Sequence, residues 1–526
     1  MCSETVKYLK ALAGGFESVN MGVYKGNIYG SDTSRIFAMQ RKKDVESLVD
    51  FWKEKVKDKY FELTHPVKKI RTKAFYNIQY GMVNFVIMAD SNYENIWIIA
   101  QLQNLIDVVI FDNKIFRAYH SNVSPILPHI NKLYNVVRDK PKKESHFFGF
   151  SLSQVRPYHH FYDHVKFFLD FGNEKPVFNK KSFFIPKSCE LEEGGSRVFL
   201  FPNVIGNNYV NQKRSSLVKI LNERMEKCVY KDALLHSEGE RGKIGKDKQL
   251  TIWFGITGQK RSWLEQIEGC INIIKKLRPC FEGVVLYIDG MTAVQGEKVV
   301  NEEDDAVYRG IKKGLIEVEG VEVHSLVGWD YREKIVCCDT VDIFIANAGT
   351  GCLVPLRFVR KPGVLHSNNK LFTFPDEYPD SVKEVHKSYV IDVVNGESDA
   401  AMHVSYHIPW QHIFNLAAEL LNEIKGTEIT SLDVPPVVDI KKAYDKEMQA
   451  QEEIRSYFQL LENSIKRDPS SPSILRDVAF AFEKAGDIHT AMKIMEKAQL
   501  LRPQGPVIKR KLDEYRVALK KDISYF

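Results

Sequence analysis

The sequence predicts an α/β protein in which two α/β domains in tandem are followed by an α-helical appendage. Three observations lead to this fold class. Short apolar runs alternate with amphipathic segments over residues 249–430, a polar and glycine-rich stretch precedes them at residues 236–248, and charged, helix-favouring sequence follows Pro435 and Pro436. Regular alternation of strands and helices is typical of a parallel, doubly wound sheet with right-handed crossovers.

The size and composition of the chain limit its function class. Its 526 residues are too many for one hydrophobic core and indicate roughly two to four domains. There is no apolar run of about 18 residues and no signal-like N-terminus, so we expect a cytoplasmic protein. A net charge of +6 does not indicate nucleic-acid binding, although it is compatible with peripheral contact with an anionic membrane surface. The eight cysteines lack CxxC spacing, which predicts neither a zinc site nor a disulfide framework.

The N-terminal part of the chain divides into an arm and a first α/β domain. The arm, residues 1–69, has one expected amphipathic helix, Lys43 to Lys57. In the domain, residues 70–235, apolar runs bounded by Asn, Asp and Gly predict several strands with at most one helix between the early ones. The expected strands are residues 83–88, 96–100, 108–111, 147–152 and 197–201, and an amphipathic helix is expected over residues 215–227.

The segment Phe147 to Phe171 carries the candidate catalytic group. Its strand runs through a proline-containing loop into an aromatic helix, so the polar residues that follow lie near the carboxyl end of the strand, where α/β proteins gather ligand groups. These residues are His159, His160, Asp163 and His164. On a helix His160 shares a face with Asp163 or His164. We expect His160, Asp163 or His159 to act as a general base on a hydroxyl.

Two other interpretations of this group stay open. The histidines would cap the helix and hydrogen-bond loop carbonyls in a purely structural role. Alternatively, His160 and His164 would bind a metal ion, because histidines four residues apart form the helical zinc pair. Phe161 stands where the HExxH motif has its glutamate, so the sequence predicts no metal ligands.

A second α/β domain, residues 249–430, follows residues 236–248, which read HSEGERGKIGKDK and are predicted to be an exposed interdomain linker. The expected strands of this domain are residues 250–256, 283–289, 321–325, 341–346, 362–366 and 389–394. The expected helices are residues 263–277, 306–315, 331–337, 353–359 and 410–423.

A glycine turn, Asn347-Ala348-Gly349-Thr350-Gly351, follows the strand at residues 341–346. We expect a helix to begin there, with its first amides pointing out of the carboxyl edge of the sheet, where they would hold an anionic group such as a phosphate. The turn has neither GxGxxG nor GxxxxGK[ST] spacing, so neither an NAD site nor a nucleoside-triphosphatase site follows. The alternative is that the turn is only a turn.

Two further loops leave the predicted sheet at the same edge. The loop after residues 250–256 combines small residues with two cations, Lys260 and Arg261, which suits a diphosphate. The loop after residues 321–325 contains Trp329, which would wall a pocket for a base. Ordinary surface charge is the alternative for the two cations. The predicted ligand-binding set is Thr257, Lys260, Arg261, Trp329, Asn347, Gly349, Thr350 and Gly351.

Residues 437–526 are predicted to be a helical region with one tetratricopeptide-like repeat, a helix pair in which small residues allow close packing. The residues at the repeat spacing are Leu475, Val478, Ala479, Phe482, Gly486, Ala491, Met495, Ala498 and Pro503. Flanking helices are expected over residues 439–466 and 507–520. A single repeat normally needs neighbours, so we expect a small cap or a surface that docks a protein partner.

Three stretches of the chain resemble glycosyltransferases: PYHHFYDHVKFFLDF, ITGQKRSWLEQ and CDTVDIFIANAGTGCLVPLRFVRKPGVL. The tandem α/β arrangement over roughly residues 70–425 resembles the GT-B architecture of two Rossmann-like domains. The three stretches are distantly similar to glycosyltransferase family 61 and to bacterial capsule and lipopolysaccharide sugar transferases. Where that family usually has His-Gly-Ala at the turn, this chain has Ala348-Gly349-Thr350.

The resemblance implies a metal-independent glycosyltransferase of bacterial surface polysaccharide biosynthesis, peripheral at the inner membrane or free in the cytoplasm. The nucleotide sugar would be its substrate, without a cofactor, and the acceptor would be a glycan or lipid-linked glycan on the first domain. Arg261 and Lys260 would stabilise the departing nucleoside diphosphate together with amides of the turn. His160 or Asp163 would take the acceptor proton if the enzyme inverts, and closure about the linker would expel water.

Three other functions stay open from the sequence. One is a protein O- or N-glycosyltransferase that uses the C-terminal helices as its acceptor dock. Another is a sugar-nucleotide epimerase of the same fold. The third is a non-catalytic protein whose C-terminal helices recruit partners.

Overall fold

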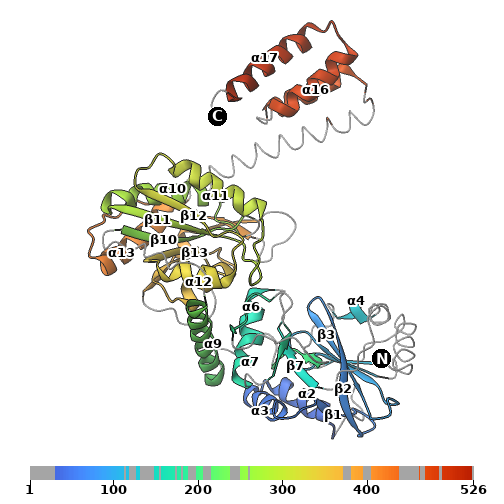
Figure 1. Ribbon diagram of the computed structural model, residues 1–526. Helices are drawn as coiled ribbons and strands as arrows, with labels where there is room; N and C mark the ends of the chain where they lie inside the picture. The colour runs from blue at the N-terminus through green and yellow to red at the C-terminus, as the bar shows by residue number, and fades with distance from the viewer. Residues whose placement is uncertain are drawn as a thin grey trace. The chain divides into compact units, whose positions relative to one another are not determined.

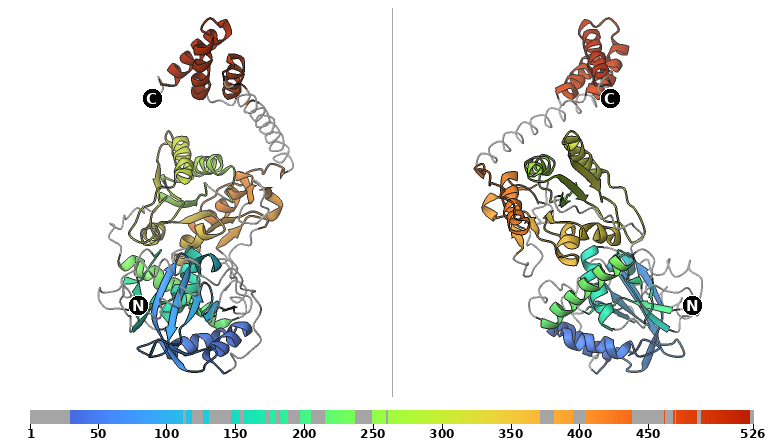
Figure 2. Two further views of the ribbon diagram at one scale, coloured as in Figure 1. Left: turned by 90° about the vertical axis from the view of Figure 1, so that its right-hand side faces the viewer. Right: turned by 60° about the vertical axis from the view of Figure 1, so that its left-hand side comes forward.

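The computed structural model consists of two compact units, Met1–Val434 and Pro435–Phe526, and each is considered by itself. Figure 1 and Figure 2 show their helices and strands. The structure describes residues 30–111, 114–117, 126–130, 147–152, 156–171, 175–178, 182–187, 197–204, 215–236, 249–258, 261–370, 381–394, 404–437, 461, 468, 470–484 and 488–523. Apart from His236, the predicted linker lies outside these residues. Within them, no helix is both long and apolar enough to cross a bilayer.

Two short helices, α2 (Asp32–Lys42) and α3 (Val45–Lys55), open the described chain. Each begins after a side chain that accepts a backbone N–H of the first turn, Ser31 for α2 and Asp44 for α3. Helix α3 buries an apolar stripe that includes Trp52. This is the amphipathic helix that the sequence predicts, two residues shorter at each end.

Strands β1 to β6 form one antiparallel sheet in chain order, and this corrects the prediction of a first Rossmann-like domain. Their bounds are Glu62–Thr64, Arg71–Tyr80, Val83–Ala89, Trp97–Gln101, Val108–Phe111 and Lys114–Arg117. The segments between these strands are too short for a crossover helix, and a chain that turns directly back pairs antiparallel. Two Rossmann-like domains in tandem are therefore not confirmed.

A three-stranded parallel sheet in the order β8-β7-β9 follows. Its strands are β7 (Phe147–Ser151), β8 (Val177–Phe178) and β9 (Arg197–Leu200). Between β7 and β8 lie α6 (Pro157–His159), a π-helical turn η2 (His160–Val165) and α7 (Lys166–Phe171); α4 (Leu127–Ile130) precedes β7, and α9 (Ser216–Leu235) ends this half of the unit. The aromatic helix after β7 is therefore confirmed, although its middle part, η2, is a π-helical turn wider than an α-helix.

The second half of this unit contains a six-stranded, entirely parallel sheet in the order β12-β11-β10-β13-β14-β15. The strands are β10 (Gln249–Gly255), β11 (Gly283–Asp289), β12 (Val321–Ser325), β13 (Ile343–Asn347), β14 (Gly363–His366) and β15 (Val382–Glu384). Numbered along the chain, this is the 3-2-1-4-5-6 order of a Rossmann-type sheet, whose direction of winding reverses between its first and fourth strands. The predicted parallel, doubly wound sheet is confirmed here.

Helices cover both faces of this sheet (Figure 1). On one face lie α10 (Gln266–Leu277), α11 (Glu302–Leu315) and α13 (Trp410–Lys425), and on the other lie α12 (Tyr331–Asp339) and the π-helical turn η6 (Leu353–Phe358). The connections also contain three short 3₁₀ turns, η4 (Arg278–Cys280), η5 (Thr350–Cys352) and η7 (Lys387–Tyr389). The strand expected over residues 389–394 is wrong as a member of this sheet, because β16 (Ile391–Val394) pairs antiparallel with β17 (Val404–His407) instead.

Alternate side chains of the strands enter two different cores. In β10, Ile252 and Phe254 pack in the core formed with α10, α11 and α13, whereas Trp253 packs on the α12 and η6 side. The second core also contains Trp52 and Phe161 from the N-terminal half. The two halves of this unit therefore share one hydrophobic core, which a closing motion about the linker would have to disrupt.

Helix α9 supports the shared core with polar contacts. Asp232 on α9 pairs with Arg332 on α12 at 2.6 Å, and both side chains are buried. The Tyr162 hydroxyl donates to Glu226 on α9 at 2.9 Å, and the same carboxylate pairs with Arg360. These contacts fix η2 and α12 against the same helix.

The C-terminal unit contains α15 (Pro472–Lys484), α16 (Ile488–Leu501) and α17 (Pro506–Ile523). Its core gathers Ala479, Ala491, Met495 and Ala498 with three residues of α17. Small side chains on α15 and α16 thus let the pair pack closely, and α17 corresponds to the helix expected over residues 507–520. Residues 439–466 lie outside the described part except for position 461, and a tetratricopeptide repeat stays a prediction.

Candidate functional site

The candidate site lies at the carboxyl edge of the parallel sheet, between β10 and β13. These neighbouring strands run parallel. After β10 the chain winds toward one edge of the sheet, and after β13 it winds toward the opposite edge. Ligands of open α/β sheets bind at this kind of reversal because the two departing loops diverge there. The loop after β10 contains Arg261, and the loop after β13 is the predicted glycine turn.

The structure brings Arg261 and Gly349 into direct contact. A Cβ atom added to Gly349 would lie 3.1 and 3.2 Å from the two terminal guanidinium nitrogens of Arg261. Gly349 has φ +136° and Arg261 has φ 55°, so both backbones occupy the region that L side chains rarely adopt. Glycine adopts such a conformation without steric cost, but Arg261 does not, and an unfavourable conformation at a contact is typical of a site held in place by its surroundings.

Asn347, the last residue of β13, is buried beside this contact, with 5% of its surface exposed. Its Oδ1 has no hydrogen-bond partner among the described residues. A Cβ atom added to Gly351 would lie 3.0 Å from this oxygen, so the amide points into the glycine turn. A buried acceptor without a donor is unfavourable by about 1–3 kcal/mol, which makes Asn347 a candidate for ligand contact.

The loop before Arg261 is built by its own hydrogen bonds. The Thr257 N–H donates to Gln266 Oε1 at 3.1 Å, and the Ser262 hydroxyl donates to the Thr257 carbonyl at 2.8 Å. The Gly258 N–H donates to buried Asp304 at 2.6 Å, and a Cβ atom at Gly258 would lie only 2.6 Å from the Glu303 backbone. Thr257 therefore shapes the loop through its backbone and through its hydroxyl, which donates to the Ser262 hydroxyl at 3.3 Å.

Strand β17 holds the other end of the same loop. The Tyr406 N–H donates to the Ser262 carbonyl at 3.0 Å, and the Leu264 N–H donates to the Tyr406 carbonyl at 2.9 Å. Burial raises the pKa of Tyr406, and the positive charge of Arg261 opposes this rise. Arg261 thus lies near the Tyr406 side chain, and three strands contribute to the site.

His366 and Tyr406 belong to this site although the sequence did not single them out. His366 ends β14 and lies opposite Asn347 in the strand register. Its Nδ1 lies 2.8 Å from the Tyr406 hydroxyl, and its Nε2 has no hydrogen-bond partner among the described residues. Burial lowers the pKa of His366 to about 3, so the imidazole is neutral. The available signal was its position at the carboxyl end of a predicted strand.

The other predicted ligand-binding residues have different places. Trp329 follows β12, which β11 separates from β10, so Trp329 is not at the strand reversal. Its ring lies beneath the Lys298 ammonium at 4.4 Å instead. Thr350 begins η5, but its side chain is outside the described part of the structure, as is all of Lys260. The role of Lys260 therefore stays a prediction.

The helix expected after the glycine turn differs from the prediction. It consists of a 3₁₀ turn, η5, followed by a π-helical turn, η6, rather than an α-helix. The Cys352 N–H donates back to the Gly349 carbonyl at 3.3 Å. That amide is used within the turn, so the positive charge next to the turn comes mainly from Arg261.

The residues of the predicted catalytic group differ in how deeply they are buried. His160 is fully buried, and its Nε2 lies 2.6 Å from the Phe184 carbonyl oxygen, which is the structural arrangement left open by the sequence. His159 is partly exposed, with its Nδ1 2.5 Å from Asp163 Oδ2. Burial alone would lower the pKa of His159, but the hydrogen bond and negative charge of Asp163 together raise it. Proton transfer by His159, His160 or Asp163 stays a prediction, and His159 is the accessible member.

Phe161 connects this group to the parallel sheet. Its ring lies 5.0 Å from that of Tyr331 at the start of α12 and 4.7 Å from that of Phe358 at the end of η6. Both η2 and η6 are π-helical, a form that often occurs at functional sites because it re-aims side chains. The segment after the glycine turn and the His159–Asp163 segment therefore pack against each other.

A buried ion pair closes the carboxyl end of β11. Asp289 pairs with Lys334 at 2.6 Å, and the ammonium also donates to the carbonyls of Gly290 and Met291. In dinucleotide-binding sheets an acidic residue at this end of the second strand binds ribose hydroxyls. Here the Asp289 carboxylate pairs with Lys334 rather than with a ribose, which agrees with the absence of a GxGxxG motif from the sequence.

No family model matches the chain, and no curated protein sequence matches it. Among solved structures, the chain is similar to E. coli ADP-heptose LPS heptosyltransferase II, with a TM-score of 0.24 and 14% sequence identity. That match covers 36% of this chain and 52%, about half, of the heptosyltransferase. A TM-score this low does not establish a shared fold, so the functional proposal depends on the site itself.

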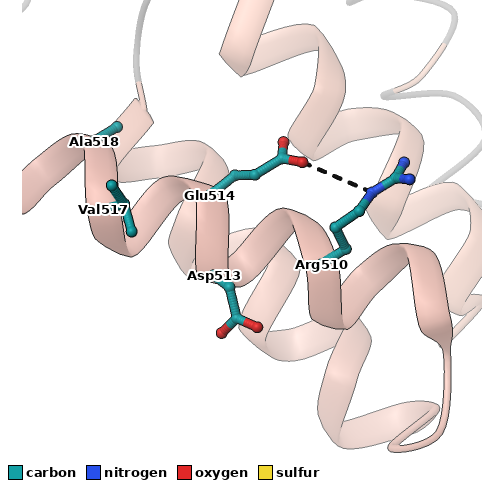
Figure 3. Close-up of a pocket in the computed structure, with 5 residues that line it drawn as sticks. All are labelled: Arg510, Asp513, Glu514, Val517 and Ala518. Carbon is teal, nitrogen blue, oxygen red and sulfur yellow. Dashed lines mark ion pairs between the residues drawn. The ribbon is translucent and has the colours of Figure 1, made fainter.

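Two other places where a site could lie, a metal centre and a hollow on α17, offer nothing comparable among the described residues. Three or more His, Cys, Asp or Glu side chains are nowhere grouped there to hold a metal ion. A hollow on α17 is lined by Arg510, Asp513, Glu514, Val517 and Ala518 (Figure 3). Arg510 and Glu514 form an exposed ion pair at 3.7 Å across it, so this is a solvated helix face.

Proposed function

We propose that this protein is a glycosyltransferase that transfers a sugar from a nucleotide-sugar donor to a glycan acceptor in bacterial surface polysaccharide biosynthesis. The observation that supports it is the contact of Arg261 with Gly349 beside the unpartnered Asn347, at the reversal point of a Rossmann-type sheet. A guanidinium there offers paired donors to a diphosphate. Glycine at position 349 lets the ligand and the guanidinium approach the backbone.

The role of Arg261 in the reaction depends on where negative charge develops in the transition state. As the bond between the sugar and the diphosphate breaks, negative charge accumulates on the leaving diphosphate. A fixed cation next to that position stabilises the transition state more than the ground state. Arg261 supplies this cation, and the hydrogen bonds of β17 to the Ser262–Leu264 segment hold the loop that carries it.

Proton transfer from the acceptor hydroxyl is assigned to the His159–Asp163 pair. His159 is the partly exposed member of the predicted group, and Asp163 orients its ring through Nδ1, which leaves Nε2 for the acceptor. The proposal gives His160 a structural role, because its ring is buried with Nε2 2.6 Å from the Phe184 carbonyl oxygen. The pair lies on η2, next to the helix that follows the glycine turn.

The partners follow from the same proposal. The donor is a nucleotide sugar, the acceptor is a glycan or lipid-linked glycan, and no separate cofactor takes part. The C-terminal unit would dock a protein partner or the acceptor. Activity would be located in the cytoplasm, with peripheral contact at the inner membrane where the acceptor is lipid-linked.

Thermal-shift measurements with nucleotide sugars test the proposal. A donor at about one hundred times its Kd stabilises the folded state by about 2.7 kcal/mol, so a matching donor raises the melting temperature. Arg261→Ala is expected to remove this response. Arg309→Ala, an exposed arginine on α11, is the matched control and should keep it. A panel of UDP-, GDP- and ADP-linked sugars that leaves the melting temperature unchanged would contradict the proposal.

A product assay separates transfer from other chemistry at the same site. A glycosyltransferase releases nucleoside diphosphate at a rate that depends on the acceptor. A sugar-nucleotide epimerase would change the sugar without an acceptor, and a non-catalytic protein would bind no donor.

A further inference from the structure

Two buried polar atoms at the site cannot both be satisfied by the oxygen of a phosphate. Asn347 Oδ1 accepts hydrogen bonds but cannot donate one, and a phosphate oxygen at neutral pH also accepts. The two would repel each other if they met. His366 Nε2, on the neighbouring strand, is likewise buried and without a hydrogen-bond partner among the described residues. Arg261 therefore supplies the anion contact in this proposal, and the pair taken together fits a ligand group that both donates and accepts a hydrogen bond.

The positions of the two side chains match a single small group. Asn347 and His366 are register partners on β13 and β14, so their Cα atoms are about 4.8 Å apart and their side chains lie on one face of the sheet. That face is the one on which His366 meets Trp263, with ring centroids 5.6 Å apart. The pair and the loop that carries Arg261 therefore lie on the same side of the sheet edge.

The hydrogen bond to Tyr406 sets the chemistry of His366. Its Nδ1 lies 2.8 Å from the Tyr406 hydroxyl, and the neutral ring has one nitrogen that carries hydrogen and one that does not. When the tyrosine hydroxyl donates to Nδ1, Nε2 carries the hydrogen and donates outward. A ligand hydroxyl can accept from Nε2 while it donates to Asn347 Oδ1. A phosphate oxygen or an ammonium group can satisfy only one of the two.

We infer that Asn347 and His366 form a hydroxyl-binding pair, so that this site takes a phosphate ester of a sugar rather than a bare phosphate or diphosphate. The inference rests on the proposed function and adds its specificity: Arg261 binds the phosphate, and the pair binds a ring hydroxyl next to it. The ring is either the ribose of the nucleotide or the transferred sugar. Tyr406 is the positioning residue, because it fixes the tautomer of His366.

The test compares ligands with and without the hydroxyl. The probes are inorganic pyrophosphate, then ADP, UDP and GDP, and then the corresponding nucleotide-linked hexoses, titrated by calorimetry. Asn347→Leu and His366→Phe are expected to weaken binding of the sugar esters about tenfold or more. Both variants should change pyrophosphate affinity less than about twofold, whereas Arg261→Ala should weaken every probe. An effect already seen with the nucleoside diphosphates assigns the hydroxyl to ribose, and one seen only with the hexose conjugates assigns it to the transferred sugar.

A stability measurement excludes a merely structural role. Asn347→Leu removes a buried acceptor that lacks a donor, so the ligand-free variant should melt at or above the temperature of the unchanged protein. A large drop in its melting temperature would overturn the inference, and so would equal losses for pyrophosphate and sugar esters or no loss at all. In each of those outcomes a response to nucleotide sugars would still support the proposed function. Failure of every probe to bind would overturn both.

Discussion

Arg261 is held in a left-handed backbone conformation by contacts on each side of it. The Thr257 carbonyl, which precedes Arg261, accepts hydrogen bonds from the Ser262 hydroxyl and the Gln266 side-chain amide. After Arg261, the backbone of Tyr406 pairs with that of Ser262 and Leu264. A non-glycine residue with positive φ is unfavourable and persists where its surroundings determine it. The guanidinium then lies against Gly349, which has no Cβ to displace it.

Gly349→Ala is expected to remove the response to nucleotide sugars. The alanine Cβ would lie 3.1 Å from the Arg261 guanidinium, and the backbone has φ +136°, so both residues would have to move. The strain is expected to lower stability by about 1–3 kcal/mol. Gly426→Ala is the matched control, because Gly426 has φ +64° with nothing within 4 Å. It should lose stability and keep the ligand response, measured by thermal shift; the same ligand response in both variants would contradict the assignment of Gly349.

His366 should make the protein less stable in mild acid. Burial lowers its pKa to about 3, from an ordinary value near 6.5, so between these pH values the unfolded chain binds a proton that the folded chain does not. Stability therefore falls as pH decreases below about 6.5, by roughly 2 kcal/mol at pH 5 for this one group. His366→Phe should reduce the difference between urea unfolding at pH 7.5 and pH 5 by about that amount. An unchanged difference would show that His366 is protonated in the folded protein.

At the scale of elements, α12 is the helix that ties the sheet edge to the N-terminal half. It begins at Asp330, whose side chain accepts from the Glu333 N–H. One face of α12 contacts α9 through Arg332, and Lys334 reaches Asp289 at the end of β11. Burial raises the pKa of Asp289 to about 6, and the charge of Lys334 opposes that rise.

Lys334→Met is expected to be strongly destabilising. It would leave Asp289 buried without its cation, and breaking a buried pair from one side typically reduces stability by about 3–5 kcal/mol. Adding Asp289→Asn to Lys334→Met should recover part of that loss, since no charge would then remain buried. Urea unfolding at pH 7.5 measures both variants. A loss below about 1 kcal/mol in the single variant would mean that water or another group replaces Lys334.

For the whole molecule, the decisive feature is that the N-terminal half and the parallel sheet form one unit with a common core, whereas the C-terminal helices form another. The antiparallel sheet, α9 and α12 all contribute residues to that common core, and the buried Asp232–Arg332 ion pair joins α9 to α12. The C-terminal helices have a small core of their own, made of alanines, Met495 and three residues of α17.

Removal of residues 435–526 should leave the first unit folded and able to bind a donor. Among the described residues of that segment, none belongs to the two large cores of the first unit. The shortened chain should show cooperative unfolding and the same thermal shift with a nucleotide sugar. If the helices dock a protein acceptor, transfer to that acceptor is lost while donor binding remains. Loss of donor binding in a folded truncated chain would place a donor contact in the C-terminal unit.

The sequence by itself determined the local structure of the second α/β domain and the two loops of its site. The strands at residues 283–289 and 321–325 match the structure at both ends, and β10, β13 and β14 differ by one or two residues. An apolar run indicates that a strand is buried on both faces, and this can be recognised from a short stretch of sequence alone. The glycine turn and Arg261 were recognised in the same way, from residue types between predicted elements.

Only the tertiary structure decided which of these elements are neighbours. It placed β13 beside β10, which brings Gly349 to Arg261, and it separated Trp329 from them by placing β11 between β10 and β12. It also buried His160, paired His366 with Tyr406, and made the first sheet antiparallel. Strand order and side-chain burial depend on contacts between residues far apart in the chain, and the spacing of residues within one segment carries no record of them.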